Sequence, residues 1–284
     1  MIIPKVIDWQ ITNACNRKCK FCYGPTSVEN FMELHKAKEV ILKFKSLGAK
    51  VIGITGGEPL LYPNIIELLQ FIKEQGLFIG LNTNCDYYSL FRNEILSIVN
   101  ALEIPIEASN SQLHDSIRGK NNFNNVFNAL TDSFNNGNLI YRIGTVVLDE
   151  NVEELINIEK MLAQFKDKII YWKIYEYISY SNKDMKENNF NVFEQAQKIN
   201  LGKYLNRDKI IFDSASTRSR SYFLVKPTGD VFVPLSSSKQ STEQNLGNIL
   251  FDDELKILNN WNSFIVGKKY QHCSRCIFRK AGFI

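Results

Sequence analysis

The chain has 284 residues, of which 44% are hydrophobic, so it is long enough to bury a substantial core in one large domain or two smaller ones. Lys and Arg exceed Asp and Glu by only four and are spread along the chain, so the charge does not indicate a nucleic-acid partner. Neither an apolar run of membrane-spanning length nor a signal-peptide pattern is present, so we expect a cytoplasmic protein without membrane association.

Six apolar, strand-like runs alternate with amphipathic stretches through the first two thirds of the chain. The runs cover residues 5–11, 51–55, 78–82, 101–108, 140–148 and 169–177, and the amphipathic stretches cover residues 35–47, 64–75, 88–99, 123–134 and 152–165. Gly48, Gly76 and Gly137 stand where these helices would end in a left-handed residue. Repeated strand–helix units with short connections predict parallel strands joined by right-handed crossovers, in a barrel or a doubly wound sheet.

A different module is expected after residue 178. Residues 179–191 are polar and rich in Asn and Lys, which is typical of a surface excursion or a domain junction. Residues 222–234 predict a β-hairpin that turns at residues 227–230, and a short helix is expected at about 252–261. We therefore expect a first unit over residues 1–178 and a small mixed α+β extension over residues 179–284.

Three of the six cysteines, Cys15, Cys19 and Cys22, lie within eight residues directly after the first predicted strand. In a chain without signs of secretion, such clustering predicts a metal centre and not disulfides. A 4Fe-4S cluster normally takes four thiolates, so three would leave one iron open to bind a substrate or cofactor. Zinc is the alternative, but a structural zinc site takes a fourth Cys or His at close spacing, and the next candidate is His35.

The spacing Cys-x3-Cys-x2-Cys, with the aromatic residues Phe21 and Tyr23 beside the third cysteine, resembles the signature of the radical S-adenosylmethionine superfamily. Similar motifs follow the next three strands in the same order: Gly56-Gly57-Glu58-Pro59, then residues 81–84 (Leu-Asn-Thr-Asn), then residues 114–119 (His-Asp-Ser-Ile-Arg-Gly). Each motif stands at the end of a predicted parallel strand, where ligand sites gather. The resemblance implies an α/β fold with a partial (β/α)6 TIM-like barrel over residues 1–178.

The resemblance also assigns site residues. It gives the 4Fe-4S cluster to the three cysteines, and S-adenosylmethionine to the strand ends. Gly56, Gly57 and Pro59 belong to the motif that approaches the methionine part of the cofactor. Glu58 would receive the ammonium of that part, and Arg118 would pair with its carboxylate. Asn82 and Ser109 would form hydrogen bonds with the ribose, and Tyr23, Val146 and Val147 would border the adenine. Many relatives read Ser-x-Asp-Gly after the fourth strand, whereas residues 109–112 read Ser-Asn-Ser-Gln here, so an acidic contact of those relatives is missing.

The resemblance implies radical chemistry. In this family the cofactor's amine and carboxylate bind the open iron, and the reduced cluster passes one electron to the sulfonium. The products are methionine and a 5′-deoxyadenosyl radical, which removes a hydrogen atom from the substrate. A reductant such as flavodoxin or ferredoxin would supply the electron. Cys85 follows the third-strand motif at the expected mouth of the site and is a candidate hydrogen donor, the alternative being an ordinary buried thiol.

The C-terminal pair Cys273 and Cys276, with His272 beside it, resembles a degenerate SPASM or Twitch extension. Two thiols are few for the auxiliary cluster of such extensions, so we expect a relic or redox-inert pair, with bound zinc or a cluster completed by another subunit as alternatives. Such tails are frequent in enzymes that modify ribosomally made peptides, and peptide epimerisation or cross-linking is therefore the leading hypothesis. The alternatives are a radical enzyme that acts on a small molecule such as a nucleotide or sugar, and a non-catalytic, zinc-stabilised nucleic-acid-binding protein.

Overall fold

The computed structural model describes residues 2–22, 30–178, 191–236 and 241–265. The predicted adenine contact Tyr23 and the C-terminal pair Cys273 and Cys276 lie outside these ranges, as do residues 179–190 of the predicted excursion. Within the described ranges the strands form one sheet, in the order β10-β9-β8-β1-β2-β3-β4-β5-β6-β7.

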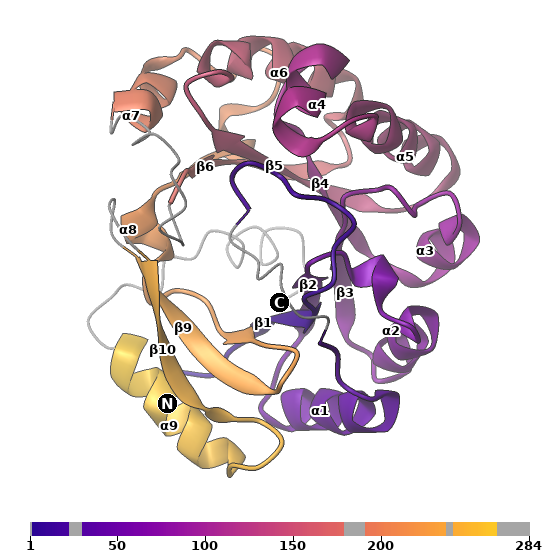
Figure 1. Ribbon diagram of the computed structural model, residues 1–284, viewed down its shortest axis with the longest axis vertical. Coiled ribbons are helices and arrows are strands. Elements are labelled where there is room, and N and C mark those ends of the chain that lie inside the picture. Colours follow the sequence, from indigo (N-terminus) through magenta and orange to yellow (C-terminus); the bar gives the residue numbers. More distant parts are fainter. Residues whose placement is uncertain (1, 23–29, 179–190, 237–240, 266–284) are drawn as a thin grey trace.

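The first six strands are parallel and follow the six predicted runs. They are β1 (Val6–Thr12), β2 (Val51–Gly56), β3 (Phe78–Asn82), β4 (Ala101–Pro105), β5 (Ile140–Val147) and β6 (Ile169–Glu176). The sheet curves into an arc with helices on its outer side (Figure 1), and it does not close into a full barrel. The predicted α/β fold and partial TIM-like barrel are confirmed.

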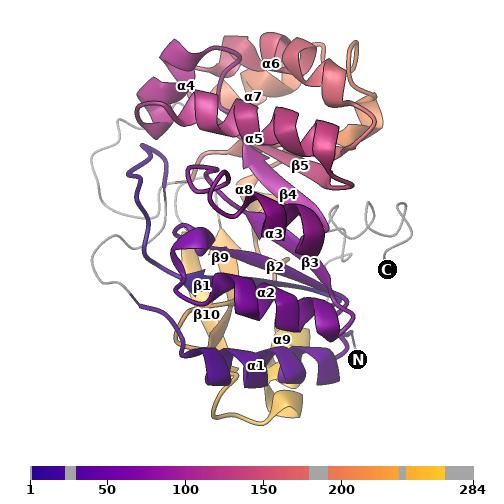
Figure 2. The ribbon, with the colours of Figure 1, turned by 90° about the vertical axis from the view of Figure 1, so that its right-hand side faces the viewer.

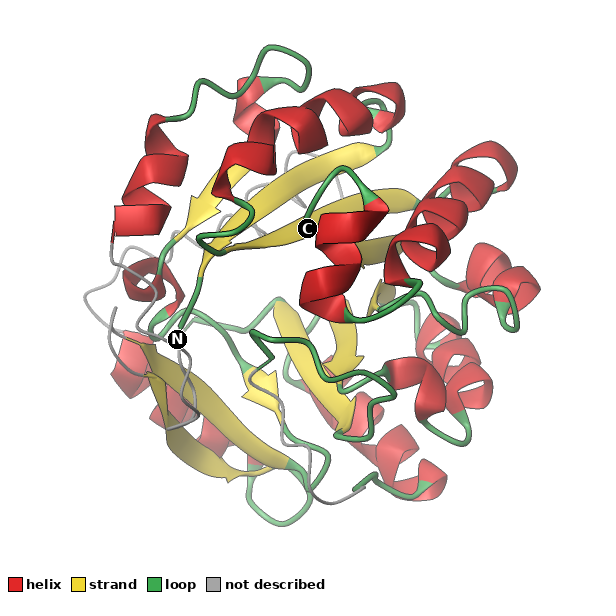
Figure 3. Ribbon diagram, turned by 45° about the horizontal axis from the view of Figure 1, so that its top comes forward, coloured by secondary structure: helices red, strands yellow, loops and turns green. Residues whose placement is uncertain are grey.

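Helices between the strands cover the outer face of the sheet, as Figure 3 shows in red against yellow. The amphipathic stretches correspond to α1 (Leu34–Ser46), α2 (Ile65–Glu74), α3 (Arg92–Ile98), α5 (Asn122–Asn136) and α6 (Leu155–Leu162). Short 3-10 helices lie at η1 (Pro59–Leu61), η2 (Val152–Glu154), η3 (Ala163–Phe165) and η4 (Arg207–Lys209). None of the helices in the described ranges is both long and apolar enough to cross a lipid bilayer.

Side chains alternate between the two faces of the barrel strands. On β1 the indole of Trp9 is fully buried and packs edge-on against Phe44 of α1, with ring centroids 5.6 Å apart, whereas the preceding Asp8 lines the interior. On β6 the same alternation buries Trp172 and turns Lys173 to the interior. The outer face therefore forms the apolar core with the helices, and the inside of the barrel carries charged side chains among aromatic and aliphatic ones.

Residues beyond 178 extend this sheet at both edges. After α7 (Asn191–Lys198), β7 (Ile210–Asp213) adds a parallel strand beside β6 that the sequence does not predict. After α8 (Ala215–Arg218), β8 (Leu224–Val225) pairs in parallel with β1 and forms the predicted hairpin with β9 (Asp230–Ser236). β10 (Ser241–Asn248) and α9 (Glu254–Ile265) complete the described chain. The division at residue 178 stays a prediction.

The C-terminal helix and the hairpin are attached to the N-terminal part of the barrel. α9 lies near the N-terminus and α1 in both side and front views (Figure 2). The backbone N–H of Ile2 donates to Asn262 Oδ1 at 2.8 Å, and Lys43 Nζ of α1 donates to the Ile249 carbonyl at 2.8 Å. These contacts hold the hairpin in place beside the open part of the barrel.

Two of the three predicted helix-ending glycines adopt the expected conformation. Gly48 and Gly76 have φ of 86° and 72°. The prediction for Gly137 is wrong, because this residue is extended, with φ −133°. A Cβ atom at Gly137 would lie 2.8 Å from Cδ2 of Leu96 in α3, so the glycine there allows close packing and does not form a left-handed turn.

Candidate active site

The cysteine-rich loop follows β1 at the end of the barrel where the parallel strands finish. Cys15, Cys19 and Cys22 all line one cavity of about 210 Å³, here called the cysteine cavity. Thr55 and Asn82, from the ends of β2 and β3, line the same cavity. The loop therefore lies at the carboxyl edge of the sheet, where this fold places its ligands.

Three thiols are the ligand set that a 4Fe-4S cluster with one open iron requires. Among the described residues, no three His, Cys, Asp or Glu side chains are placed to hold one metal ion. A tetrahedral zinc site needs sulfurs about 2.3 Å from the ion and thus about 3.8 Å from one another. In a 4Fe-4S cluster each thiolate binds a different iron, so the sulfurs lie farther apart. Partial burial raises the pKa of the Cys15 and Cys19 thiols, and a bound cation would stabilise their thiolates.

The glycine pair after β2 supports the cysteine loop. The backbone N–H of Gly57 donates to the Thr12 carbonyl, and that of Glu58 donates to the Ala14 carbonyl, each at 2.8 Å. A Cβ atom would lie 2.1 Å from Thr12 O if added at Gly56, and 2.1 Å from Ala14 O if added at Gly57. Only glycine allows the two backbones this approach. Of the pair, Gly57 lines the cysteine cavity.

Glu58 is fully buried and lines neither cavity. Its carboxylate accepts hydrogen bonds from Leu60 N at 3.1 Å, Thr83 Oγ1 at 2.8 Å and Asn84 N at 2.7 Å. Burial raises the pKa of Glu58 to about 7, against the effect of these donors. Glu58 therefore joins the loop after β2 to the loop after β3, and its contact with the cofactor ammonium stays a prediction. Pro59, also buried, begins η1.

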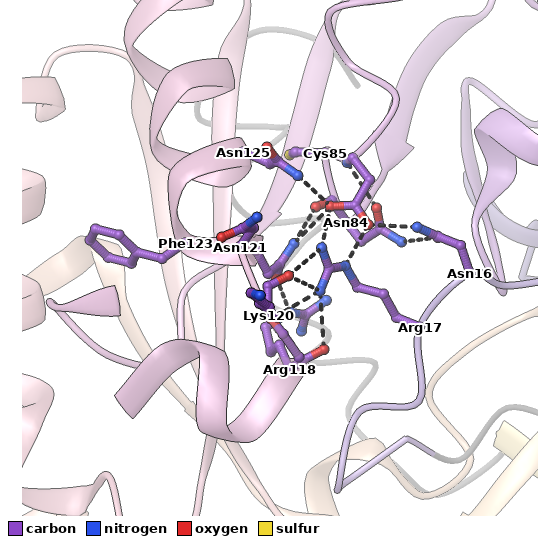
Figure 4. Close-up of polar contacts among 12 residues, drawn as sticks. Asn16, Arg17, Asn84, Cys85, Arg118, Lys120, Asn121, Phe123 and Asn125 are labelled. Carbon is purple, nitrogen blue, oxygen red and sulfur yellow. Dashed lines mark hydrogen bonds and ion pairs between the residues drawn. The ribbon is translucent and has the colours of Figure 1, made fainter. Parts of the chain in front are cut away.

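Asp86 ties the cysteine loop to two other parts of the barrel, and Figure 4 shows its partners Asn16, Arg17 and Asn125 pointing toward one another from two separate segments of the chain. Its carboxylate accepts from Arg17 Nε at 2.6 Å, Arg17 Nη2 at 2.5 Å, Asn16 Nδ2 at 2.6 Å and Asn125 Nδ2 at 2.8 Å. Arg17 Nη1 also donates to the Gly119 carbonyl at 3.0 Å. The loop is thereby held against the segment after β3 and the turn between α4 (Ser111–Arg118) and α5.

Arg118, at the end of α4, lines the cysteine cavity as its motif predicts. Its Nη1 lies 3.1 Å from Glu107 Oε1, its Nε donates to Asn122 Oδ1 at 2.8 Å, and its carbonyl accepts from Cys19 Sγ at 3.7 Å. Burial raises the pKa of Glu107 to about 7, although the Arg118 charge opposes the shift. Arg118 thus has a carboxylate partner inside the protein, and its contact with the cofactor carboxylate stays a prediction.

The remaining cofactor residues divide into two groups. Asn82 and Val146 line the cysteine cavity. Val147 is buried on the other face of β5. Ser109 lines neither cavity, and its Oγ donates to Glu154 Oε2 at 2.6 Å. The structure therefore brings Asn82 and Val146 to the cysteines, and it does not bring Ser109 or Val147 there.

Cys85 lies beneath the site and not at its mouth. Its side chain is 2% exposed, lines neither cavity and donates from Sγ to the Thr83 carbonyl at 3.7 Å. Burial raises the pKa of the thiol well above its usual range, and the residue has a left-handed backbone with φ 67°. The role of Cys85 as a hydrogen donor stays a prediction, and its buried thiol has no direct path to either cavity.

A second cavity of about 300 Å³ adjoins the first inside the barrel and is here called the barrel cavity. The two share Phe21, Cys22, Thr55, Asn82, Glu103, Val146 and Tyr175. Phe232 and Pro234 of β9 and Glu243 of β10 also line the barrel cavity. The C-terminal hairpin therefore forms part of its wall.

Two buried ion pairs contribute Arg142, Glu103 and Lys173 to the wall of the barrel cavity. Arg142 Nη2 lies 3.0 Å from Glu103 Oε2, and Lys173 Nζ lies 3.2 Å from Asp213 Oδ2. A Cβ atom at Gly80 would lie 2.9 Å from Arg142 Nη2, so the glycine in β3 makes room for the guanidinium. The sequence motifs do not predict a role for Arg142 or Lys173. Both lie inside strands, on β5 and β6, where alternate side chains face the interior of the barrel, and this alternation is the signal in the sequence that could have indicated them.

Residues 9–162, more than half of the chain, match the family model of the Radical SAM superfamily. The chain belongs to this superfamily and is a radical S-adenosylmethionine enzyme. Enzymes of this superfamily use a 4Fe-4S cluster and S-adenosylmethionine. The predicted class and cofactors are confirmed, and this membership replaces the alternative of a non-catalytic zinc protein.

Two curated relatives match the first part of the chain. The AdoMet-dependent heme synthase of Methanosarcina barkeri is 28% identical over 160 residues, which cover 54% of this chain and 45% of the relative. The mycofactocin maturase MftC of Mycolicibacterium smegmatis is 24% identical over 169 residues, which cover 57% of this chain and 42% of the relative. The matches thus span less than half the length of these relatives.

Solved structures share the fold over most of the chain. Streptococcus suis SuiB bound to S-adenosylmethionine aligns with a TM-score of 0.68 and 17% identity, covering 90% of this chain and 65% of SuiB. The enzyme anSMEcpe with bound AdoMet and a Cp18Cys peptide aligns with a TM-score of 0.67 and 15% identity, covering 92% of this chain and 82% of that enzyme. At such identities the alignments establish a common fold.

Proposed function

We propose that this enzyme abstracts a hydrogen atom from a peptide and so begins its epimerisation or cross-linking. The observation that carries the proposal is the barrel cavity, which adjoins the cysteine cavity and has the C-terminal hairpin in its wall. When bound, the cluster and S-adenosylmethionine supply a 5′-deoxyadenosyl radical for this abstraction. Cys15, Cys19 and Cys22 would hold the cluster.

Side chains that the two cavities share support a substrate position beside the cofactors. Phe21 and Tyr175 line both cavities. The two cavities are therefore adjacent, and a group bound in the barrel cavity would lie next to the cysteine cavity. The rings of Tyr171 and Tyr222 also line the barrel cavity and limit the room for water near a reactive intermediate. Gly57, Asn82, Arg118 and Val146 are the predicted cofactor residues that line the cysteine cavity, and we retain them as its cofactor contacts.

Similar proteins support a peptide substrate. SuiB has been solved with its precursor peptide SuiA and aligns with a TM-score of 0.64, and anSMEcpe was solved with a peptide. MftC is named a maturase. The hairpin and α9 occupy the part of the chain that we assign to a degenerate SPASM or Twitch extension, residues 179–284. The heme synthase match favours the second candidate, a radical enzyme acting on a small molecule.

Deuterium transfer distinguishes the two candidates. Anaerobically reconstituted enzyme is incubated with S-adenosylmethionine, reduced flavodoxin or ferredoxin, and a pool of short peptides made from fully deuterated amino acids. Abstraction from a peptide places deuterium in 5′-deoxyadenosine, which mass spectrometry detects. Parallel pools contain deuterated nucleotides or sugars. Labelling by the peptide pool alone supports the proposal, and labelling by a small-molecule pool alone overturns it.

A further inference from the structure

Two of the three cations that line the barrel cavity in the described chain have carboxylate partners. Arg142 pairs with Glu103 and Lys173 pairs with Asp213, and all four side chains are largely buried. Arg218 is the third cation, and no carboxylate of the described residues lies within ion-pair distance of it. No carboxylate among the described residues therefore neutralises its charge by direct contact.

The guanidinium of Arg218 is nevertheless held in a fixed place. Its Nη2 donates to the carbonyl of Glu176, and its central carbon lies 5.6 Å from the ring centroid of Tyr175. The Glu176 carboxylate is turned to the start of α8, where its Oε2 accepts from Ala215 N at 2.6 Å. Nε of Arg218 is buried and has no hydrogen-bond partner in the described ranges. A positioned cation that lines a cavity and has no carboxylate partner among the described residues provides the charge and the side-chain chemistry of an anion site.

The surroundings of Arg218 show how a bound anion would orient the rest of its molecule. Tyr175, on which the guanidinium packs, lines both cavities, and Tyr171 and Tyr222 line the barrel cavity with it. An anion at Arg218 therefore leaves the attached group among aromatic rings, on the side that adjoins Cys22. This arrangement suits a ligand with one carboxylate and a largely apolar remainder.

We propose that Arg218 binds a carboxylate of the substrate, and that the substrate is a carboxylate-bearing, amino-acid-like molecule whose apolar part fills the barrel cavity. The inference rests on the proposed function in so far as it places a peptide in this cavity. The carboxylate is either the C-terminus of a peptide or the side chain of an acidic residue, and both would form the same paired contact with a guanidinium.

Binding of matched ligands to the full-length chain tests the proposal without any turnover. The probes are N-acetyltyrosine, N-acetyltyrosinamide and N-acetylglutamic acid α-amide, measured by ligand-observed NMR or calorimetry. Wild type is expected to bind N-acetyltyrosine about tenfold more tightly than its amide, because only the acid can pair with Arg218. Tighter binding of the glutamic acid derivative than of N-acetyltyrosine would assign the site to an acidic side chain.

Variants at two arginines separate the site from general charge effects. Arg218→Gln is expected to remove the preference for the acid, and Arg218→Lys to keep part of it. The control is Arg220→Gln, because Arg220 is exposed, lies on the same segment and lines neither cavity. Thermal unfolding of each variant shows that it is folded.

The assignment would be overturned if wild type bound the acid and the amide equally, or if Arg218→Gln kept the preference for the acid. It would also be overturned if Arg218→Gln bound S-adenosylmethionine more weakly than wild type, because Arg218 would then be a contact of the cofactor. The proposed function fails separately. If the enzyme binds the acid through Arg218 but takes no deuterium from the peptide pool, the proposed carboxylate site stands and the proposed peptide reaction is wrong.

Discussion

Arg17 and Asp86 form a two-point ion pair across 69 residues of sequence, with Nε–Oδ2 at 2.6 Å and Nη2–Oδ1 at 2.5 Å. The two side chains are 9% and 11% exposed. Arg17 stands between the first two cysteines, and Asp86 follows β3. The pair thus fixes the cysteine loop against the barrel through contacts that the protein makes by itself.

Breaking this ion pair should loosen the cysteine loop before any cluster is bound. We expect Arg17→Gln and Asp86→Asn each to lower the free energy of unfolding by about 1–3 kcal/mol, because each leaves a largely buried charge without its partner. Limited proteolysis of the apoprotein should show faster cleavage within residues 15–22. Lys18→Gln is the control, since Lys18 is exposed in the same loop. Cleavage rates equal to wild type in both variants would contradict this account.

His114 should make the apoprotein less stable in mild acid. The buried imidazole accepts from the Glu107 N–H on Nδ1 at 3.2 Å, and its Nε2 lies 3.1 Å from Asn122 Oδ1. Burial, followed by the Arg118 charge, lowers the pKa of His114 to about 4. The unfolded chain therefore binds this proton more readily, so the stabilisation is complete above pH 6.5 and is lost progressively as the pH falls towards 4, by about 2–3 kcal/mol.

Urea unfolding at pH 7 and pH 4.5 checks this dependence. We expect the loss of stability between the two values to be smaller in His114→Gln than in wild type. His35→Gln should behave as wild type, because His35 is exposed. The comparison with a variant is needed because Glu58 and Glu107, with pKa values raised to about 7, change stability in the opposite direction. Identical pH dependence in His114→Gln and wild type would refute the prediction.

Gly57→Ala should impair cluster loading more than it impairs folding. The added methyl group would lie 2.1 Å from Ala14 O, so the cysteine loop must move away, at a cost of about 1–3 kcal/mol. Gly76→Ala is the matched control: Gly76 has φ 72° but open space around its Cβ position, so the variant should lose about 1–2 kcal/mol through backbone strain alone. Iron and sulfide content after reconstitution should fall in Gly57→Ala and stay normal in Gly76→Ala. Full loading of both would count against a supporting role for the glycine pair.

Cys85→Ala should retain both cleavage of S-adenosylmethionine and conversion of the substrate. The thiol lines neither cavity, and its small side chain is replaced at modest packing cost. Production of 5′-deoxyadenosine and of modified substrate, measured in the same reaction, checks this. If cleavage continued while the substrate product disappeared, Cys85 would have the hydrogen-donor role that its sequence position suggests.

Much of the fold follows from the sequence because the buried strands are unbroken apolar runs between helical patterns. The elements that were missed are short or polar. β7 (Ile210–Asp213) has four residues, and α4 has an exposed, polar sequence whose His114 and Ile117 are its buried residues. Gly137 lacks the predicted left-handed conformation, and its close contact with Leu96 depends on tertiary structure that the sequence pattern does not contain.

The candidate site was only partly accessible from sequence. Motifs predict the cysteines, the glycine pair and Arg118 as site residues, and the structure places the cysteines, Gly57 and Arg118 around one cavity. They could not show that Glu58 and Ser109 have protein partners, since these contacts join separate loops. The partnership of Arg17 with Asp86 depends on the same kind of long-range contact.

We predict that Cys15, Cys19 and Cys22 hold a cluster that cleaves S-adenosylmethionine. The most direct measurement is formation of 5′-deoxyadenosine by anaerobically reconstituted enzyme with dithionite and S-adenosylmethionine, with the Cys15→Ala, Cys19→Ala, Cys22→Ala triple variant as control. The account predicts 5′-deoxyadenosine from wild type and none from the variant. A reconstituted wild-type enzyme that carries the four-iron cluster and binds the cofactor, yet never cleaves it even with peptide and small-molecule pools present, would contradict it.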